Sequence, residues 1–391
     1  MLLKKDNWII KKIGEVCDVV GGSTPKTNNP QYWDGDNYWV TPAELDGKKW
    51  ISSTERTITE MGVKSARLQL LPSGTVLLSS RAPIGKVAIT TCPMYCNQGF
   101  KNLVCKKEVH NEFIYWLLLF SSEYLKSLGT GATFKEISKK VVEQIEIPIP
   151  PLSEQSRIVE ELDQLSNIIE KKRQQLSELD NLAQSIFYDM FGDPVTNEKG
   201  WEVKKLGDIC DISSSKRIYA NEYCEEGVPF YRGKEITEKS KGNEISVELF
   251  ISTKKYEELK VKFGVPKIGD ILITAVGTIG NIWVVNTDEP FYFKDGNVLW
   301  LQLKSDINSK YFKFLLEILI DKHKTSMANG CAYSALTIIN LREMATNLIP
   351  LTLQQLFAQK IEAIEKEKEL IKQSIKETEE LFNSRMDYYF G

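Results

Sequence analysis

Two stretches of this sequence carry the same heptad pattern of apolar residues, and such a pattern needs a long helix with a partner. Apolar side chains recur at alternating intervals of four and three residues in residues 153–190 and again in residues 357–389. This spacing is typical of coiled-coil helices. The apolar seam positions are Ile158, Leu162, Leu165, Ile169, Leu176, Leu179 and Ile186, then Phe357, Ile361, Ile364, Ile371, Ile375 and Phe382.

The length of the two helices predicts how their seams are covered. A helix of about 38 residues is roughly 57 Å long, which is more than one small domain can cover. Prolines precede both stretches and mark where each helix begins, because proline breaks a helix interior. We expect the two helices to run antiparallel and to bury each other's seams, with Lys172 as a polar interruption. The alternative is that each helix packs only on its own globular segment.

The globular segments that precede the helices also repeat. The sequence WIIKKIGEVCD at 8–18 matches WEVKKLGDICD at 201–211, and residues 74–86 match residues 269–281. Self-similarity at this spacing indicates a duplicated unit. The predicted order is a first domain at 1–151, a first helix at 152–192, a second domain at 193–351 and a second helix at 352–391.

Each globular segment reads as a mixture of short strands and helices. Strands rich in β-branched and aromatic residues are expected at 38–41, 76–79, 86–90, 230–232, 271–275 and 282–286, with helices at 112–127 and 309–322. Glycine, proline and asparagine turns separate them. Strands and helices do not alternate strictly, so the expected class is α+β, without a dinucleotide-binding fold.

Composition excludes several classes of protein. The formal net charge of −3 argues against a general nucleic-acid coat, and no apolar run approaches the ~20 residues that span a bilayer. No signal peptide is recognisable, so we expect a cytoplasmic protein without a membrane partner. The seven cysteines lack the CxxC pairs of zinc sites, so we predict reduced core thiols and no metal site.

Several motifs together resemble the specificity subunit of a Type I restriction-modification system over essentially the whole chain. They are GGSTPKTNNPQYW, YWVTPAEL, GTVLLSSRAPIGKVAI, IPIPPLSEQSRIVEELD at the first helix start and FYDMFGDP at its end. A proline-leucine-x-x-glutamine entry into a heptad helix, present twice, is the specific part.

The resemblance implies a non-catalytic subunit with two target recognition domains, each of which reads one half of a split double-stranded DNA site. It implies that the helices set the spacer and dock two methyltransferase subunits, with restriction subunits completing the complex. It also implies that this chain binds no cofactor, whereas S-adenosylmethionine, ATP and magnesium are bound by the partner subunits.

Reading DNA requires side chains that reach base edges or phosphates, and these are expected in loops. In the first domain the candidates are Ser23, Thr24, Lys26, Arg81, Lys86, Thr133, Phe134 and Lys135. In the second domain they are Lys216, Arg217, Tyr219, Arg232, Lys234, Tyr333 and Ser334. Trp33, Trp39 and Trp201 are interpreted as core residues rather than stacking platforms.

Two other functions fit part of the sequence. Asn29-Pro30-Gln31-Tyr32 differs by one residue from the base-gripping loop of amino-methyltransferases, which suggests a self-sufficient adenine methyltransferase. However, no glycine-rich S-adenosylmethionine loop accompanies it, and the second domain lacks the motif. The other alternative is an assembly scaffold without sequence preference.

Overall fold

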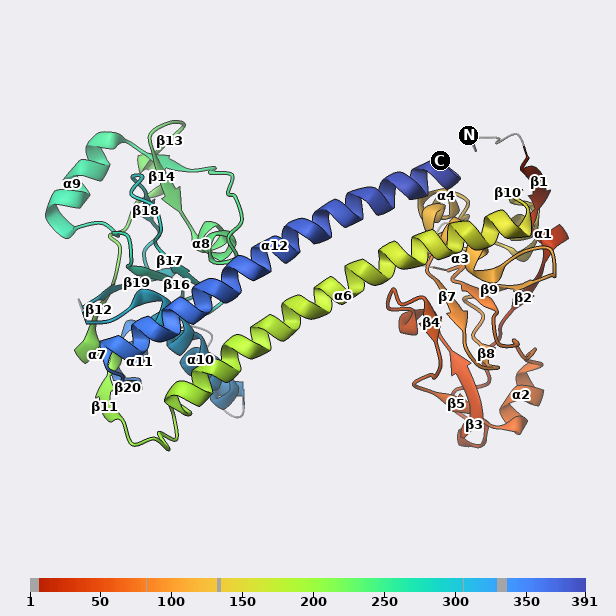
Figure 1. Cartoon of the computed structure of the whole chain (residues 1–391), viewed down its shortest axis with the longest axis horizontal. Helices are drawn as coiled ribbons and strands as arrows, with labels where there is room; N and C mark the ends of the chain where they lie inside the picture. The colour runs from red at the N-terminus through yellow and green to blue at the C-terminus, as the bar shows by residue number, and fades with distance from the viewer. Residues whose placement is uncertain (1–6, 82, 132–134, 305, 329–335) are drawn as a thin grey trace. The chain divides into compact units, whose positions relative to one another are not determined.

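The computed structural model describes residues 7–328 and 336–391, apart from residues 82, 132–134 and 305. Two compact units make up the chain (Figure 1). The first contains residues 1–174 and 371–391, and the second contains residues 175–370. Each unit therefore combines one globular segment with part of both long helices. The two units are defined by which residues contact one another. The four segments expected from the sequence, two recognition domains and two long helices, remain a prediction.

The first unit contains a five-stranded sheet in the order β2-β9-β6-β7-β4, a three-stranded sheet β5-β3-β8 and a two-stranded ribbon β1-β10. Its strands are β1 Ile9–Lys12, β2 Cys17–Gly21, β3 Trp33–Val40, β4 Trp50–Ile51, β5 Thr57–Ile58, β6 Val76–Leu78, β7 Val87–Thr90, β8 Tyr95–Cys96, β9 Lys101–Cys105 and β10 Glu146–Ile149. Its short helices are α1 Ile13–Val16, η1 Pro30–Tyr32, η2 Pro42–Glu44, α2 Glu60–Ala66, α3 Asn111–Phe120, α4 Ser122–Ser127 and α5 Lys139–Gln144.

The second unit follows a similar plan with two four-stranded sheets, β12-β19-β16-β17 and β13-β15-β14-β18, and a ribbon β11-β20. Its strands are β11 Glu202–Lys205, β12 Cys210–Ser214, β13 Tyr223–Cys224, β14 Val228–Tyr231, β15 Phe250–Ile251, β16 Ile271–Thr274, β17 Ile282–Val284, β18 Tyr292–Phe293, β19 Val298–Leu303 and β20 Ala345–Leu348. Its short helices are α7 Leu206–Ile209, η3 Ala220–Glu222, α8 Gly233–Ser240, α9 Thr253–Phe263, α10 Ser309–Ala328 and α11 Ile338–Glu343. The predicted α+β class is confirmed.

The duplication extends to individual backbone partners. The first ribbon pairs Ile9 with Ile149, and the second pairs Glu202 with Leu348, both antiparallel. In the sheet β5-β3-β8 of the first unit, β3 runs parallel to β8. In the sheet β13-β15-β14-β18 of the second unit, β14 runs parallel to β18. Because hydrogen-bond registers coincide, a position in one unit identifies its counterpart in the other without reference to sequence identity.

The long helices are α6 Leu152–Phe191 and α12 Leu351–Phe390, each within two residues of the predicted bounds. In the first unit, Lys172 of α6 donates to the hydroxyl oxygens of Ser374 (2.6 Å) and Thr378 (3.1 Å) of α12. In the second unit, Lys368 of α12 forms an ion pair with Asp180 of α6. Glu161 of α6 also pairs with Arg385 of α12 in the first unit, and Phe187 packs against Phe357 in the second. Within each unit, rising numbers on α6 therefore meet falling numbers on α12, and the predicted antiparallel pairing is confirmed there.

The helix ends bury more residues than the heptad pattern predicts. Phe187 and Phe191 of α6 are buried in the second unit, and Met386 and Phe390 of α12 are buried in the first. Phe390 packs edge-on against Phe113 of α3, with ring centroids 5.6 Å apart. The last turns of each helix therefore bury a second apolar face against the globular part, which a two-position heptad seam does not describe.

A half-buried lysine connects the globular part of the first unit to α6. Lys49, which precedes β4, forms ion pairs with Glu112 of α3 and Asp163 of α6, and only 14% of its side chain is exposed. The indole of Trp116 also donates to Asp163 at 2.9 Å. One cation thus balances two carboxylates from different elements, and removing it would leave both without their counter-charge.

We predict that Lys49→Met lowers the free energy of unfolding by about 2 to 3 kcal/mol, because two half-buried carboxylates lose their cation. Chemical denaturation of the two proteins measures this difference. Lys48→Met is the matched control, since the Lys48 side chain is 80% exposed and pairs with exposed Asp46. The control should stay within about 0.5 kcal/mol of the parent. Equal effects from both substitutions would contradict the assigned role of Lys49.

Candidate nucleic-acid interface

The glycine loop between β2 and η1 is held in place by two tryptophans. The indole of Trp39 donates to the carbonyl oxygen of Ser23 at 3.1 Å, and the indole of Trp33 donates to that of Lys26 at 3.2 Å. A Cβ atom on Gly22 would lie 2.1 Å from the carbonyl oxygen of Asn97, so this position requires glycine. Both indoles are buried, which confirms that they are core residues.

The segment that joins β8 to β9 connects this loop to the turn that carries Arg81. Its residue Gln98 contacts the hydroxyl of Thr24, and the carbonyl oxygen of Gly99 accepts a 2.7 Å hydrogen bond from the amide of Ser80. Three of the candidates, Ser23, Thr24 and Arg81, therefore belong to one connected loop system. The structure brings these three candidates together.

The charged candidates around the Arg81 turn are engaged within the protein. Arg81 donates to Glu136 at 2.8 Å, and Lys101 binds the same carboxylate at 3.1 Å. Burial alone would raise the pKa of Glu136, but these two cations outweigh it, and the pKa is lowered. Lys86 donates to the carbonyl oxygen of Pro42 at 3.2 Å. Lys135 is exposed, and Thr133 and Phe134 lie outside the described residues.

The second unit presents its candidates on equivalent loops. Lys216 lies 4.8 Å from the ring centroid of Phe263, and Arg217 donates to Asp295 at 2.8 Å. Tyr219 is exposed, whereas Tyr333 and Ser334 lie outside the described residues. Trp201 is half-buried, and its indole donates to the carbonyl oxygen of Phe191.

Arg232 and Lys234 at the start of α8 share one carboxylate. Glu248 accepts hydrogen bonds from both at 2.8 Å, and Arg232 also binds Glu235 at 2.7 Å. The hydrogen bond from Lys234, followed by that from Arg232, lowers the pKa of Glu248 to about 2. Both cations are consequently paired with carboxylates in the protein.

Asn29-Pro30-Gln31-Tyr32 has a structural role in this fold. The side chain of Asn29 accepts a hydrogen bond from the amide of Gln31 and caps the η1 turn, while Tyr32 packs beside the tryptophan cluster. Gly62 of α2 approaches the carbonyl oxygen of Tyr32 so closely that a Cβ atom there would lie 2.4 Å away. The motif therefore shapes the entry into β3.

Sequence reasoning did not select Arg56, which lies between η2 and β5 in the first unit. Its guanidinium carbon is 3.6 Å from the ring centroid of Trp33 and 5.8 Å from that of Trp39. The equivalent position in the second unit is Leu249. Because only the strand registers reveal this equivalence, the sequence alone held no signal that singles out Arg56.

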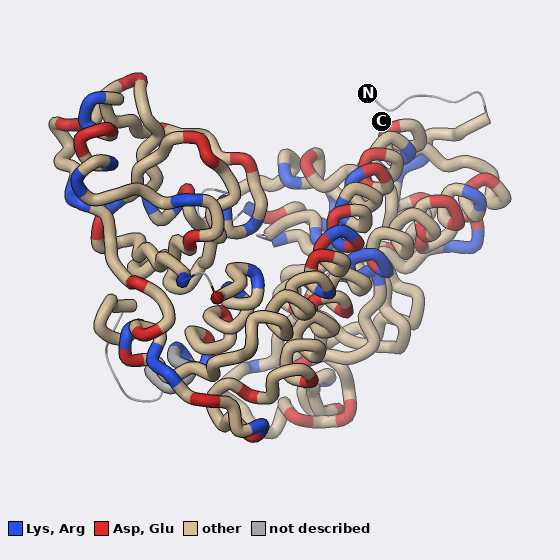
Figure 2. Tube along the Cα trace, turned by 60° about the vertical axis from the view of Figure 1, so that its left-hand side comes forward, with Lys and Arg blue, Asp and Glu red and all other residues tan. Residues whose placement is uncertain are grey.

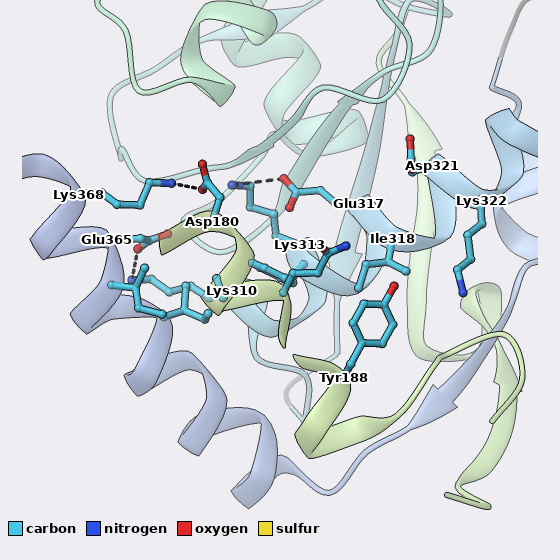
Figure 3. Close-up of a pocket in the computed structure, with 15 residues that line it drawn as sticks. Asp180, Tyr188, Lys310, Lys313, Glu317, Ile318, Asp321, Lys322, Glu365 and Lys368 are labelled. Carbon is cyan, nitrogen blue, oxygen red and sulfur yellow. Dashed lines mark hydrogen bonds and ion pairs between the residues drawn. The ribbon is translucent and has the colours of Figure 1, made fainter. Parts of the chain in front are cut away.

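A charged cavity of about 440 Å³ lies in the second unit between α10 and portions of the long helices (Figure 3). Its charged groups face one another in pairs, namely Lys310 with Glu365, Lys313 with Glu317, and Lys368 with Asp180. Partial burial raises the pKa of Glu317. Of these pairs, Lys310 with Glu365 joins α10 to α12, Lys368 with Asp180 joins the two long helices, and Lys313 with Glu317 lies within α10. Figure 2 likewise shows acidic and basic residues interspersed along both long helices.

The part of the chain that the structure describes contains no candidate metal site, membrane-spanning helix or disulfide. No group of three or more histidine, cysteine, aspartate or glutamate side chains is arranged to hold a metal ion there. None of the helices in that part of the chain is long and apolar enough to cross a membrane. Cysteines at the described positions are free thiols, whereas Cys331 lies outside them.

Comparison with known proteins identifies the family. The model of the Type I restriction modification DNA specificity domain matches twice, over residues 5–181 and 198–380. The chain belongs to this family.

Similar proteins include the Type I restriction enzyme MjaIX specificity subunit of Methanocaldococcus jannaschii, which is 39% identical to this chain over 277 residues. That match covers 66% of this chain and 63% of the relative, so the chain spans less than two thirds of that protein's length. The EcoR124I/EcoR124II specificity subunit of Escherichia coli is 30% identical over 165 residues, which cover 40% of this chain and 41% of the relative.

Solved structures agree in fold. An S subunit of a Type I restriction-modification system from M. genitalium superposes with a TM-score of 0.59 at 16% identity, covering 100% of this chain and 98% of that one. A chain from a study of complex assembly in the type I R-M system gives a TM-score of 0.63 at 19% identity, with 98% of both chains covered. The twofold specificity-domain architecture predicted from the sequence is confirmed.

We predict that Lys234→Met raises the pKa of Glu248 from about 2 toward its usual value of 4.5, because the strongest hydrogen bond to the carboxylate is lost. Carboxyl titration by nuclear magnetic resonance measures this midpoint. The folded-state pKa lies below the unfolded value, so the contact stabilises the fold above pH 4.5. That contribution is lost as the pH falls toward 2.

Lys241→Met is the matched control for this titration, since Lys241 pairs with Glu238 at 3.1 Å on the same helix-loop segment. It should leave the Glu248 midpoint in place. An unchanged midpoint in Lys234→Met would refute the assigned cause.

Proposed function

We propose that this chain is the DNA-reading subunit of a Type I restriction-modification complex. The observation that carries the proposal is the double match of a DNA specificity domain on a fold that is itself duplicated. Each globular part reads one half of a split double-stranded DNA site. A site with two separated halves follows from two reading domains on one chain.

The two halves of the site differ in sequence. The amides of Ser80 and Ala275 bond to equivalent loop carbonyls, those of Gly99 and Asn297, so the residues that follow them occupy equivalent positions. These residues are Arg81 in the first unit and Val276 in the second. A common framework with unlike side chains at its loops is the arrangement that two readers of different sequences require.

The long helices set the spacing between the halves and dock two methyltransferase subunits, and restriction subunits complete the complex. The names of the relatives, which are specificity subunits of restriction enzymes, support this assignment. Methylation and cleavage belong to those partners, together with S-adenosylmethionine, ATP and magnesium. The present chain contributes no catalytic group, and the complex acts in the cytoplasm.

A map of modified adenines tests the proposal. We expect co-expression with the partner methyltransferase, in a host that lacks other adenine methylation, to modify one motif of two fixed halves around an unspecified spacer. The reason is that two domains on one chain read the two halves at a fixed separation. Sequencing that detects methylated adenine across the genome provides the measurement.

Each other outcome selects an alternative. Methylation without a motif, or a complex that assembles and does not methylate, would favour the assembly scaffold. Methylation by this chain expressed alone would favour the self-sufficient adenine methyltransferase. The chain without its partner is therefore the control for the experiment.

A second experiment tests the spacing role. Seven residues added after Gln174 in α6 and seven after Leu370 in α12 preserve the heptad phase and lengthen both helices by about 10 Å. We expect the spacer to grow by about 3 base pairs, with both half-sequences unchanged, as read from the methylation map.

The matched control places the same seven residues at Gly242, a turn glycine with φ +78° in the second unit. That insertion should leave the spacer unchanged. An unaltered spacer in the helix variant, or an altered half-sequence, would exclude the helices as the spacing element.

A further inference from the structure

Arg56 is an exposed cation held flat against the tryptophan pair of the first unit. Its guanidinium carbon lies 3.6 Å from the Trp33 ring centroid, which is van der Waals contact with the ring face. Trp33 and Trp39 are themselves packed edge to face, 5.0 Å apart. A guanidinium on an indole face is stabilised by the cation–π attraction and keeps its N–H donors free at its edge.

The backbone of Arg56 is also fixed. Its carbonyl oxygen accepts hydrogen bonds from the amide of Trp39 at 3.3 Å and from the hydroxyl of Thr54 at 2.6 Å. The same two indoles bond the carbonyl oxygens of Ser23 and Lys26 in the glycine loop. The tryptophan pair thus positions Arg56 and the candidate loop as one platform.

The charge of Arg56 is available, unlike that of several other arginines. Arg81, Arg217 and Arg232 each form an ion pair with a carboxylate. Within the part of the chain that the structure describes, no acidic side chain forms an ion pair with Arg56. An oriented and uncompensated guanidinium loses little entropy when it binds a pair of acceptors.

The second unit places a different residue at the same point. Ile58 and Ile251 occupy corresponding strand positions, because Trp33 pairs with Ile58 as Tyr223 pairs with Ile251. The amide of Trp39 bonds to the Arg56 carbonyl oxygen, and the amide of Phe230 bonds likewise to that of Leu249. Leucine therefore fits this backbone site, and only the first unit carries the cation.

We propose that Arg56 is a specificity-determining residue that reads a guanine in the half-site bound by the first unit. This inference rests on the proposed function and adds to it the residue and the base. The guanidinium edge would donate two hydrogen bonds to O6 and N7 of guanine in the major groove, the acceptor pair that arginine fits best. Trp33 would hold the plane of the donors during recognition.

The test uses the complex with the partner methyltransferase and duplexes that carry every single-base change in the half-site of the first unit. Arg56→Leu installs the residue of the second unit. We expect the preference for guanine at one position to fall roughly 5- to 150-fold, the range of a bidentate contact. Preferences at the other half-site, and the spacer, should stay unchanged.

Two further variants complete the experiment. Arg56→Lys keeps the charge and loses the planar pair of donors, so it should relax the same position while the complex still binds DNA. It decides the outcome if Arg56→Leu yields no active complex. Lys64→Leu removes an exposed cation from α2 beside the same small sheet and should leave the motif intact.

The outcomes separate this inference from the proposed function. A uniform loss of methylation in Arg56→Leu, together with an unchanged motif in Arg56→Lys, would mean that Arg56 contacts phosphate, and it would overturn the assignment. An unchanged motif in both Arg56 variants would also overturn it. A parent complex that methylates without any motif would refute the proposed function and this inference together.

Discussion

One buried glutamine at the beginning of each long helix joins that helix to its globular part. The amide of Gln155 donates to the carbonyl oxygens of Pro150 and Glu108, and its oxygen accepts from the amide of His110 at 2.7 Å. Gln354 makes the same three contacts in the second unit. A buried primary amide is tolerated only when its groups are bonded. In each unit the glutamine therefore bonds the start of the long helix to two other segments. They are the residue after the preceding strand and the loop that precedes α3 or α10.

The glutamine also explains why the proline-leucine-x-x-glutamine motif was the most informative part of the sequence. A proline directly precedes each long helix, and the glutamine, four residues on, reaches back to the carbonyl of the residue that follows the preceding strand, Pro150 or Ile349. Motif, repeat and heptad pattern are local regularities, so the long helices, their antiparallel pairing within each unit and the α+β class could all be predicted. The buried residues Phe187 and Met386 could not, because they face the globular part and not the helix partner.

The candidate site was less predictable for a physical reason. The sequence indicates which cations lie in loops. Whether such a cation is available to contact DNA depends on which side chains the fold places beside it. Arg232 is paired with Glu235 and Glu248, whereas Arg56 rests on an indole. Glu235 lies only three residues from Arg232, but Glu248 is distant in sequence, and Trp33 and Arg56 are brought together only when β3 pairs with β5.

The two units share the residues that stabilise the fold and differ at residues that could determine which DNA sequence is read. Residues that stabilise the fold are the same in both units. Gln155 and Gln354 make matching contacts, and the two ribbons have matching registers. At one equivalent position the two units differ in chemistry: Arg56 is exposed, whereas Leu249 is partly buried and packs against an apolar cluster of the second unit. A half-site reader can therefore change its sequence preference at an exposed loop position without altering the strand pairing or the helix entry, because the backbone at that position is fixed by bonds that do not involve its side chain.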